Sequence, residues 1–520
     1  MKTFHSLADL LPLQIRTRSP KPASRHKPLL LLLPASLLFL LIFFLLRTSS
    51  SPEPSFGVVI DAGSTGTRIH VFTIRPTPYP NLSPFVVDPV AEMKVRPGLP
   101  SYAGDPGRAA ESVAELVEFA RGKVPGEVRA GTEVRLMATA GLRMLEDNVA
   151  REKILEGCRK VLRGSGFRFR DEWAAVISGR DEGIFAWVAA NYALGTLGGD
   201  PLETTGIIEL GGASAQVTFA SSEPMPPEFL RVLNFGENTY SLYSNSFLHF
   251  GQNAAYHSVQ ELLSSRVLKS STESSQKNVF IDPCSPKGYS HTEANFSSGN
   301  LNLKVEKVPV VHADGNFSEC RSAAVTMLQA EKDKCQYQQC HLGSNFIPKL
   351  QGRFLATENF FYTSKFFKLG PTPILSDFML VGKYFCGEDF LTLKEKYQTL
   401  EAEDFSRYCF SSAYIVALLH DSFGIALDDN RLQYANQVGS TELEWALGAF
   451  IMHNMSNLNT NHAYEITALV RCNIAPILSL FVVIVLLAFA VWIVLRWRKP
   501  QLKTIYDLEK GRYIITRVNR

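Results

Sequence analysis

Two widely separated stretches of this sequence repeat one pattern, and the repeat constrains the fold more than any other feature. Residues 58–72 and 206–219 each start with an apolar β-branched run, pass through one carboxylate (Asp61 or Glu209) and a Gly/Ser-rich turn, and end in a second apolar run. A strand–turn–strand unit of this kind presents backbone N–H groups and small hydroxyls that can hold a phosphate. We expect two such turns, facing each other, to hold a chain of phosphates, with a carboxylate from each reaching a metal ion.

Two uncharged, strongly apolar segments lie near the ends of the chain, at residues 29–46 and 474–495. At about 1.5 Å per helical residue, both can cross a hydrocarbon core of about 30 Å. Basic residues precede the first and follow the second, so the positive-inside rule predicts that the leader, 1–28, and the tail, 496–520, are cytosolic. A cleaved signal peptide is the alternative for the first segment, although the leader is long and no small-residue cleavage site follows.

The region between these segments is expected outside the cytosol, in an integral membrane protein of the plasma membrane or of the Golgi and other endomembranes. The whole chain has a formal charge of +3, but its basic ends supply the excess, and the remainder contains more acidic than basic residues. The absence of a basic face argues against a nucleic-acid partner. Four N-glycosylation sequons lie between the apolar segments, at Asn81, Asn295, Asn316 and Asn454.

Six of the eight cysteines are crowded into one region, at Cys284, Cys320, Cys335, Cys340, Cys386 and Cys409. In an oxidising compartment an even set of this kind is typical of disulfides. A metal or haem site at Cys335 and Cys340 is the alternative. Their spacing is wrong for c-type haem, and no second Cys/His pair supports structural zinc.

Hydrophobic periodicity predicts a strand and several helices between the two apolar segments. The strand is at 134–138, and the helices are at 107–123, 152–162, 183–197, 414–423 and 445–454. The Ser-rich residues 264–275 are expected to form a surface loop, and residues 280–345 an irregular, disulfide-stapled excursion.

The elements divide into two α/β halves, each near the usual size of a domain. After a polar linker at 47–56 come lobe I at 57–178, lobe II at 179–437 and a return to lobe I at 438–465. The cleft between two such lobes is the natural place for a ligand.

Five short motifs in order carry a family resemblance: Asp61–Thr67 (DAGSTGT), 138–143 (ATAGLR), 178–183 (SGRDEG), 209–216 (ELGGASAQ) and 445–448 (WALG). This set resembles the five conserved regions of the apyrases, or ecto-nucleoside triphosphate diphosphohydrolases, and most of all the membrane-bound plant apyrases. The resemblance spans residues 58–450. It implies a two-lobed, actin-like (RNase H-type) α/β fold and hydrolysis of the terminal phosphates of nucleoside tri- and/or diphosphates with Ca²⁺ or Mg²⁺.

The resemblance also implies a role for each matching residue. Glu182 would be the general base that activates water, with Asp181 as the alternative, and Ser214 and Gln216 would hold that water. Asp61 and Glu209 would bind the cation through its waters. These oxygen ligands suit a hard cation.

The remaining implied roles concern phosphate, nucleobase and disulfides. Thr139 would touch the terminal phosphate, and Arg143 would support its own loop. The phosphate cradle would comprise Gly63, Ser64, Thr65, Gly66, Thr67, Gly211, Gly212, Ala213 and Ser214. Phe361 and Tyr362 would contact the nucleobase, whereas Trp445 and His70 are expected to be structural. The implied disulfides are Cys284–Cys320, Cys335–Cys340 and Cys386–Cys409.

The chain departs from the family pattern at two positions in the second loop, where Glu209 replaces the usual Asp and Ala215 a common Thr. Two other functions remain open on sequence grounds. One is a sugar or acid kinase on the same scaffold, which the predicted topology and Gln216 disfavour. The other is a receptor or scaffold with an inactive nucleotide fold, which the intact carboxylates disfavour.

Overall fold

The computed structural model describes residues 54–76, 85–235, 238–271, 279–289, 310–337, 340–454, 482–493 and 502–517. The segment 29–46, the leader 1–28 and the sequons Asn81 and Asn295 lie outside the described residues. In the second apolar segment, residues 482–493 are helical. Within the described ranges, none of the helices has both the length and the apolar character that a membrane crossing requires.

The first repeat forms the centre of a five-stranded mixed sheet, in the order β3-β2-β1-β4-β5. Its strands are β1 (Ser55–Ala62), β2 (Thr67–Pro76), β3 (Phe85–Val95), β4 (Glu133–Ala138) and β5 (Ala174–Val176). β1 pairs antiparallel with β2 and parallel with β4. Asp61 therefore lies opposite Arg68 at the turn end of the β1–β2 hairpin.

The second repeat occupies the corresponding place in a six-stranded sheet, in the order β15-β14-β6-β7-β9-β8. Its strands are β6 (Gly206–Leu210), β7 (Ser214–Ala220), β8 (Leu230–Phe235), β9 (Asn238–Leu248), β14 (Phe354–Glu358) and β15 (Leu432–Tyr434). β6 pairs antiparallel with β7 and parallel with β14, as β1 does with β2 and β4. Glu209 lies opposite Gln216, which is the position that Arg68 holds opposite Asp61.

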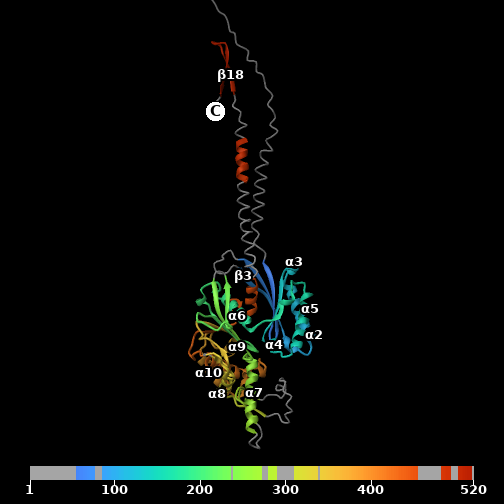
Figure 1. The fold of residues 1–520 in the computed structure, drawn as a ribbon, viewed down its shortest axis with the longest axis vertical. Coiled ribbons are helices and arrows are strands. Elements are labelled where there is room, and N and C mark those ends of the chain that lie inside the picture. Colours follow the sequence, from blue (N-terminus) through green and yellow to red (C-terminus); the bar gives the residue numbers. More distant parts are fainter. Residues whose placement is uncertain are drawn as a thin grey trace, which may run out of the picture. The chain divides into compact units, whose positions relative to one another are not determined.

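Helices α2 (Pro106–Lys123) and α5 (Asn148–Arg163) pack side by side against the first sheet (Figure 1). Their apolar faces and the buried side chains of β1, β2 and β4 form one hydrophobic core. Both helices and strand β4 match the sequence expectation. The short helices α3 (Gly126–Arg129) and α4 (Ala140–Arg143) flank β4.

A second core combines side chains from both sheets with helix α6 (Gly179–Ala193) and helix 445–454. α6 starts earlier than the predicted 183–197, because the Ser178 side chain accepts a hydrogen bond from the Asp181 N–H and caps the helix. It also ends earlier, at Ala193. A Cβ at Gly183 would lie 2.6 Å from Thr218 Oγ1, so glycine lets α6 approach β7 this closely. Glu182 is thereby fixed in the first turn of a buried helix.

The third core belongs to the helical part of lobe II. Its helices are α7 (Gln252–Ser271), α8 (Phe317–Leu328), α9 (Asn359–Phe366), α10 (Leu375–Gly387), α11 (Phe390–Lys396), α12 (Ala402–Ser406) and α13 (Tyr408–Val416). α13 continues into a π-helical turn at Ala417–Ser422, consistent with the helix expected at 414–423. Two short strand pairs complete the lobe: β10 (Val279–Asp282) with β11 (Val310–Ala313), and β12 (Cys340–Leu342) with β13 (Asn345–Phe346). A third pair, β16 (Gln437–Val438) with β17 (Thr441–Glu442), lies where the chain returns to lobe I.

Two expectations for lobe II are wrong. The predicted Ser-rich loop is helical up to Ser271. Ala255, Tyr256 and Val259 anchor α7 in the third core, and the helix continues through Ser264 and Ser265, whose hydroxyls donate hydrogen bonds to backbone carbonyls within it. The described residues between 280 and 345 are not irregular throughout, since α8 contributes buried side chains to the third core. A polar composition alone did not distinguish a solvated helix from a loop.

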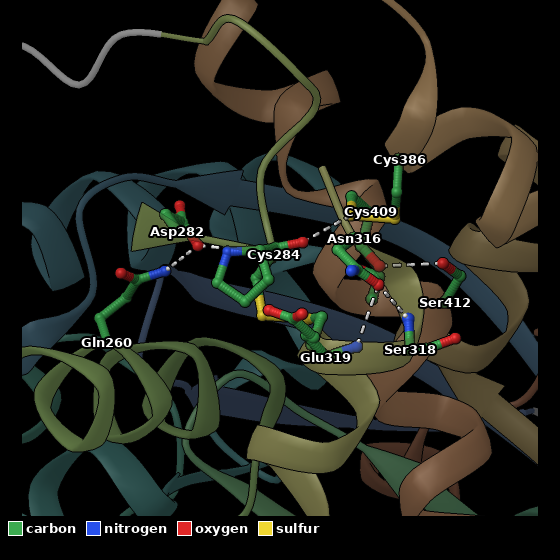
Figure 2. The surroundings of a disulfide bond; sticks show 12 residues. Gln260, Asp282, Cys284, Asn316, Ser318, Glu319, Cys386, Cys409 and Ser412 are labelled. Atoms are coloured by element: carbon green, nitrogen blue, oxygen red, sulfur yellow. Dashed lines mark hydrogen bonds between the residues drawn. A yellow bond between two sulfur atoms is a disulfide. The ribbon is translucent and has the colours of Figure 1, made fainter. Parts of the chain in front are cut away.

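The three disulfides implied by the family resemblance are present, and all lie in lobe II. Cys284–Cys320 attaches the segment after β10 to α8, and Cys386–Cys409 joins α10 to α13 (Figure 2). Asn316 caps α8 beside the first of these bonds, where its Oδ1 accepts hydrogen bonds from the N–H groups of Ser318 and Glu319. Cys158 is a free, buried thiol in α5. The C-terminal region contains a separate hairpin of β18 (Leu502–Asp507) and β19 (Arg512–Arg517).

Candidate active site

The two repeated turns line one cavity of about 140 Å³. The predicted site residues on its wall are Asp61, Gly63, Ser64, Thr65, Gly66, Thr139, Glu182, Glu209, Gly211, Gly212, Ala213, Ser214 and Gln216. A Cβ at Gly212 would lie 3.1 Å from Ser64 Oγ and 3.5 Å from Thr65 Cγ2, so the tips of the hairpins nearly touch. The structure thus brings together residues that are far apart in the sequence.

Three residues predicted for the site do not line this cavity. Thr67 is fully buried at the start of β2. Phe361 and Tyr362 lie on α9, where their rings make an edge contact and Tyr362 is 44% exposed. Trp445, expected to be structural, lines the cavity and also stacks on Phe185.

Asp61 and Glu209 each carry a buried oxygen atom, Oδ1 and Oε2, that has no hydrogen-bond partner among the described residues. Burial, with the nearby Glu182, raises the pKa of Asp61 to about 8. Burial likewise raises the pKa of Glu209 well above its usual value, and Glu182, Glu358 and Asp61 add to the effect. A buried carboxylate without a partner needs either a proton or a cation. These two hard oxygen ligands fit a hydrated Ca²⁺ or Mg²⁺ ion.

Glu182 projects from the first turn of α6 into the same cavity. Arg143 Nη2 donates a hydrogen bond to Glu182 Oε2 at 2.9 Å, and Arg143 Nη1 donates one to the Ile177 carbonyl at 3.0 Å. Burial raises the pKa of Glu182, whereas the Arg143 guanidinium opposes the rise. A carboxylate with a raised pKa is suited to accept a proton from water near neutral pH.

The alternative base, Asp181, points elsewhere. Its side chain is exposed, does not line the cavity and accepts a hydrogen bond from Ser178 Oγ at 2.7 Å. Its position on the helix explains this difference, because adjacent residues of an α-helix project in directions about 100° apart.

Ser214 and Gln216 lie on the same face of β7, since successive side chains of a strand alternate. Gln216 Nε2 donates a hydrogen bond to Ser214 Oγ at 2.7 Å, and both side chains are almost fully buried. Thr139 lies at the N-cap position of α4, where its N–H donates to the Ala62 carbonyl of β1. These three side chains place hydroxyl and amide groups on the cavity wall near the carboxylates.

Sequence reasoning missed four charged residues of the cavity wall: Arg68, Lys94, Glu358 and Glu444. Arg68 and Glu444 form an ion pair, and His70 Nε2 lies 2.9 Å from Glu444 Oε2 outside hydrogen-bond geometry. Burial and the Arg68 charge lower the pKa of His70 to about 3, so its ring is neutral. Along β2, Arg68 and His70 alternate with the core residues Ile69 and Val71, so they share the opposite face of the strand. That shared face was the only signal in the sequence, and it did not show that Arg68 lines the cavity.

The fold and the cavity define an actin-like α/β protein whose site handles phosphate groups. Residues 47–468 match the GDA1/CD39 (nucleoside phosphatase) family, and the chain belongs to this family. It is therefore a hydrolase that removes phosphate from nucleotides.

Three similar proteins illustrate the relationship. The chain is 55% identical over 470 residues to "Probable apyrase 6" of Arabidopsis thaliana, with 89% of this chain and 84% of that protein covered. It is 28% identical over 440 residues to the "Nucleoside-diphosphatase mig-23" of Caenorhabditis elegans, with 77% of each chain covered. A solved structure of nucleoside triphosphate hydrolases from Neospora caninum has a TM-score of 0.58 at 17% identity and covers 80% of this chain and 95% of its own, which shows the shared fold.

Proposed function

We propose that this protein hydrolyses the terminal phosphates of nucleoside tri- and/or diphosphates in a divalent-cation-dependent reaction, with Glu182 as the base that takes the proton from water. The observation that carries the proposal is the composition of one cavity wall. Glu182, the pair Ser214 and Gln216, and both carboxylate-bearing turns all lie on it. Direct attack by water then needs no covalent intermediate.

Different residues of the protein carry out the separate parts of the reaction. The backbone N–H groups of the two turns, with Ser64 and Thr65, bind the phosphate oxygens. Gln216 and Ser214 orient the attacking water, and Glu182 accepts its proton. Asp61 and Glu209 would hold Ca²⁺ or Mg²⁺, and the ion would offset the negative charge of the phosphates.

The test measures phosphate release by the full-length protein from a panel of nucleoside tri- and diphosphates with Ca²⁺, Mg²⁺ or a chelator. We expect release with either class of nucleotide, its loss in the chelator, and no phosphorylated acceptor. Nucleotide binding without release of phosphate would instead identify an inactive nucleotide fold.

We further propose two membrane spans, with both termini in the cytosol and the catalytic domain outside the cell or in the lumen of the Golgi or another endomembrane. The three disulfides of lobe II support an oxidising compartment. Protease treatment of sealed vesicles tests the topology. The ends of the chain should be digested and the catalytic domain protected when the vesicle lumen corresponds to the non-cytosolic side.

A further inference from the structure

The carboxylate of Glu358 has no role in the reaction described above, although it lines the same cavity as Asp61 and Glu209. It stands at the end of β14, which pairs parallel with β6 so that Thr357 is opposite Glu209 and Glu358 is opposite Leu210. The carboxyl ends of neighbouring parallel strands meet at one edge of a sheet, which is where ligands bind in open α/β folds. Glu358 therefore belongs to the same edge as the second predicted cation ligand.

The backbone at Glu358 is held in a conformation that few residues other than glycine adopt, with φ 60° and ψ −121°. Hydrogen bonds on both sides hold this conformation. Asn436 Oδ1 accepts one from the Glu358 N–H at 2.7 Å, and Asn359 Nδ2 donates one to the Leu210 carbonyl at 2.7 Å. Backbone strain that is held in place in this way is concentrated at functional sites.

The Glu358 carboxylate has no hydrogen bond and no ion pair within the described part of the chain. Arg68, one of the two cations that act on it, is already paired with Glu444. The other, Lys94, lies on β3 and lines the same cavity. Three carboxylates without ion-pair partners, at Asp61, Glu209 and Glu358, thus line a cavity that must also accept an anionic polyphosphate.

We infer that Glu358 is a third carboxylate of the cation site and acts through the water shell of the ion bound by Asp61 and Glu209. The inference rests on the proposed function and adds a positioning residue to it. Carboxylate oxygens that accept hydrogen bonds from metal-bound waters orient those waters and strengthen binding of the ion. The alternative is that Glu358 only balances the charge of Lys94 and Arg68.

The test compares the full-length wild-type protein with Glu358→Gln, which keeps the shape of the side chain and removes its charge. Free Mn²⁺ is measured by electron paramagnetic resonance in the presence of a non-hydrolysable nucleoside diphosphate analogue. We expect Glu358→Gln to weaken Mn²⁺ binding by roughly tenfold or more, as is typical when an outer-shell partner is removed. Glu358→Asp should retain part of the affinity. Glu118→Gln, on the exposed face of α2, is the matched control for net charge and should bind Mn²⁺ as the wild type does.

A second measurement separates the inference from the proposed function. In phosphate-release assays, Glu358→Gln should need a correspondingly higher Mg²⁺ concentration for half-maximal rate. If the wild type releases phosphate but Glu358→Gln binds Mn²⁺ equally well and only its KM for nucleotide changes, Glu358 is a counterion and the inference is overturned. A wild-type protein that releases no phosphate overturns the proposed function itself. Melting temperatures establish that both Glu358 variants are folded.

Discussion

Arg143 and Glu182 come from different conserved motifs, yet Arg143 Nη2 lies 2.9 Å from Glu182 Oε2. The pair links the short helix α4 of lobe I to the first turn of α6. Both side chains are largely buried, so solvent screens their interaction only weakly. The guanidinium therefore controls both the direction of the Glu182 carboxylate and the pH at which that carboxylate can accept a proton.

Arg143→Met is expected to move the acidic limb of the pH–rate profile to higher pH. Burial already raises the pKa of Glu182, and Arg143 is the group that lowers it. The base must be deprotonated to act, so a higher pKa means that activity is lost at a higher pH as the solution is acidified. The measurement is kcat/KM against pH at saturating Mg²⁺. Arg121→Met on α2 should leave the pH–rate profile unchanged. If the acidic limb of Arg143→Met lies at the same pH as in the wild type, Arg143 does not lower the pKa of Glu182.

Glu182→Gln should reduce turnover by about 10² to 10⁴, because it removes the proton acceptor and keeps the side-chain shape. The variant leaves the buried Arg143 guanidinium without its charged partner, so its melting temperature is measured alongside turnover to establish that the protein is folded. Asp181→Asn is the matched control. Asp181 is exposed outside the cavity, so we expect turnover close to that of the wild type. The opposite pattern, with Asp181→Asn inactive and Glu182→Gln active, would make Asp181 the base.

Gln216→Leu should lower kcat by about 10² with little change in KM, as expected when one preorganised polar group acts mainly in the transition state. The amide lies next to Ser214 on the cavity wall. Ser246→Ala is the control, because Ser246 Oγ lies 3.4 Å from the same amide and does not line the cavity. Steady-state kinetics distinguish stabilisation of the transition state from binding of the substrate. A rise in KM at constant kcat in Gln216→Leu would show that Gln216 contributes to substrate binding instead.

Asp61 should make the cation-free protein less stable at alkaline pH. Its pKa is about 8 in the folded protein against a reference value of 3.8, so between these values the folded state binds more protons than the unfolded state. The free energy of unfolding therefore falls as pH rises from about 4 to 8. The stabilising contribution of the protonated Asp61 side chain is fully present only below the pKa of the unfolded state, at about pH 4.

The measurement is the melting temperature in chelator at several pH values between 6 and 8.5 for the wild type and Asp61→Asn. As pH rises, the melting temperature of the wild type should fall relative to that of Asp61→Asn, because the asparagine side chain of the variant cannot become charged. Adding Mg²⁺ at pH 8.5 should stabilise the wild type more than the variant. A difference that does not change with pH would show that Asp61 is not held protonated in the cation-free protein.

Gly183→Ala should destabilise the protein by about 1–3 kcal/mol, since the new Cβ would lie 2.6 Å from Thr218 Oγ1. Activity should fall as well, because α6 carries Glu182. Gly122→Ala is the matched helical control, with no atom within 4 Å of the added Cβ, and should stabilise by up to about 1 kcal/mol. Thermal unfolding measures both. A neutral Gly183→Ala would mean that α6 can move away from β7 at little cost.

The motifs that define the chemistry were predictable because local patterns determine them. The β-branched runs around Asp61 and Glu209 form the expected hairpins, and the apolar spacing at 107–123 forms α2. The loop expected at 264–275 was wrong up to Ser271, since a Ser-rich composition does not reveal that the preceding turns of α7 are packed in the core.

Other parts of the site could not be predicted, because they depend on which strands become neighbours. No local pattern marks Glu358, and only the parallel pairing of β14 with β6 places it beside Leu210 and the end of the second hairpin. The ion pair of Arg68 with Glu444 joins residues from opposite ends of the domain. The contact of Arg143 with Glu182 also required the tertiary structure, although both motifs were recognised from the sequence.

The sequence by itself therefore determined the two carboxylate-bearing hairpins, the family and the types of residue available for catalysis, because short-range steric and hydrophobic patterns encode them. The tertiary structure decided which charged groups lie close together: Arg143 with Glu182, Arg68 with Glu444, and Glu358 near Asp61 and Glu209. The physical reason is that electrostatic interactions depend on distance and burial in space. Both are set by the packing of the two sheets around α6, and neither can be deduced from separation along the chain.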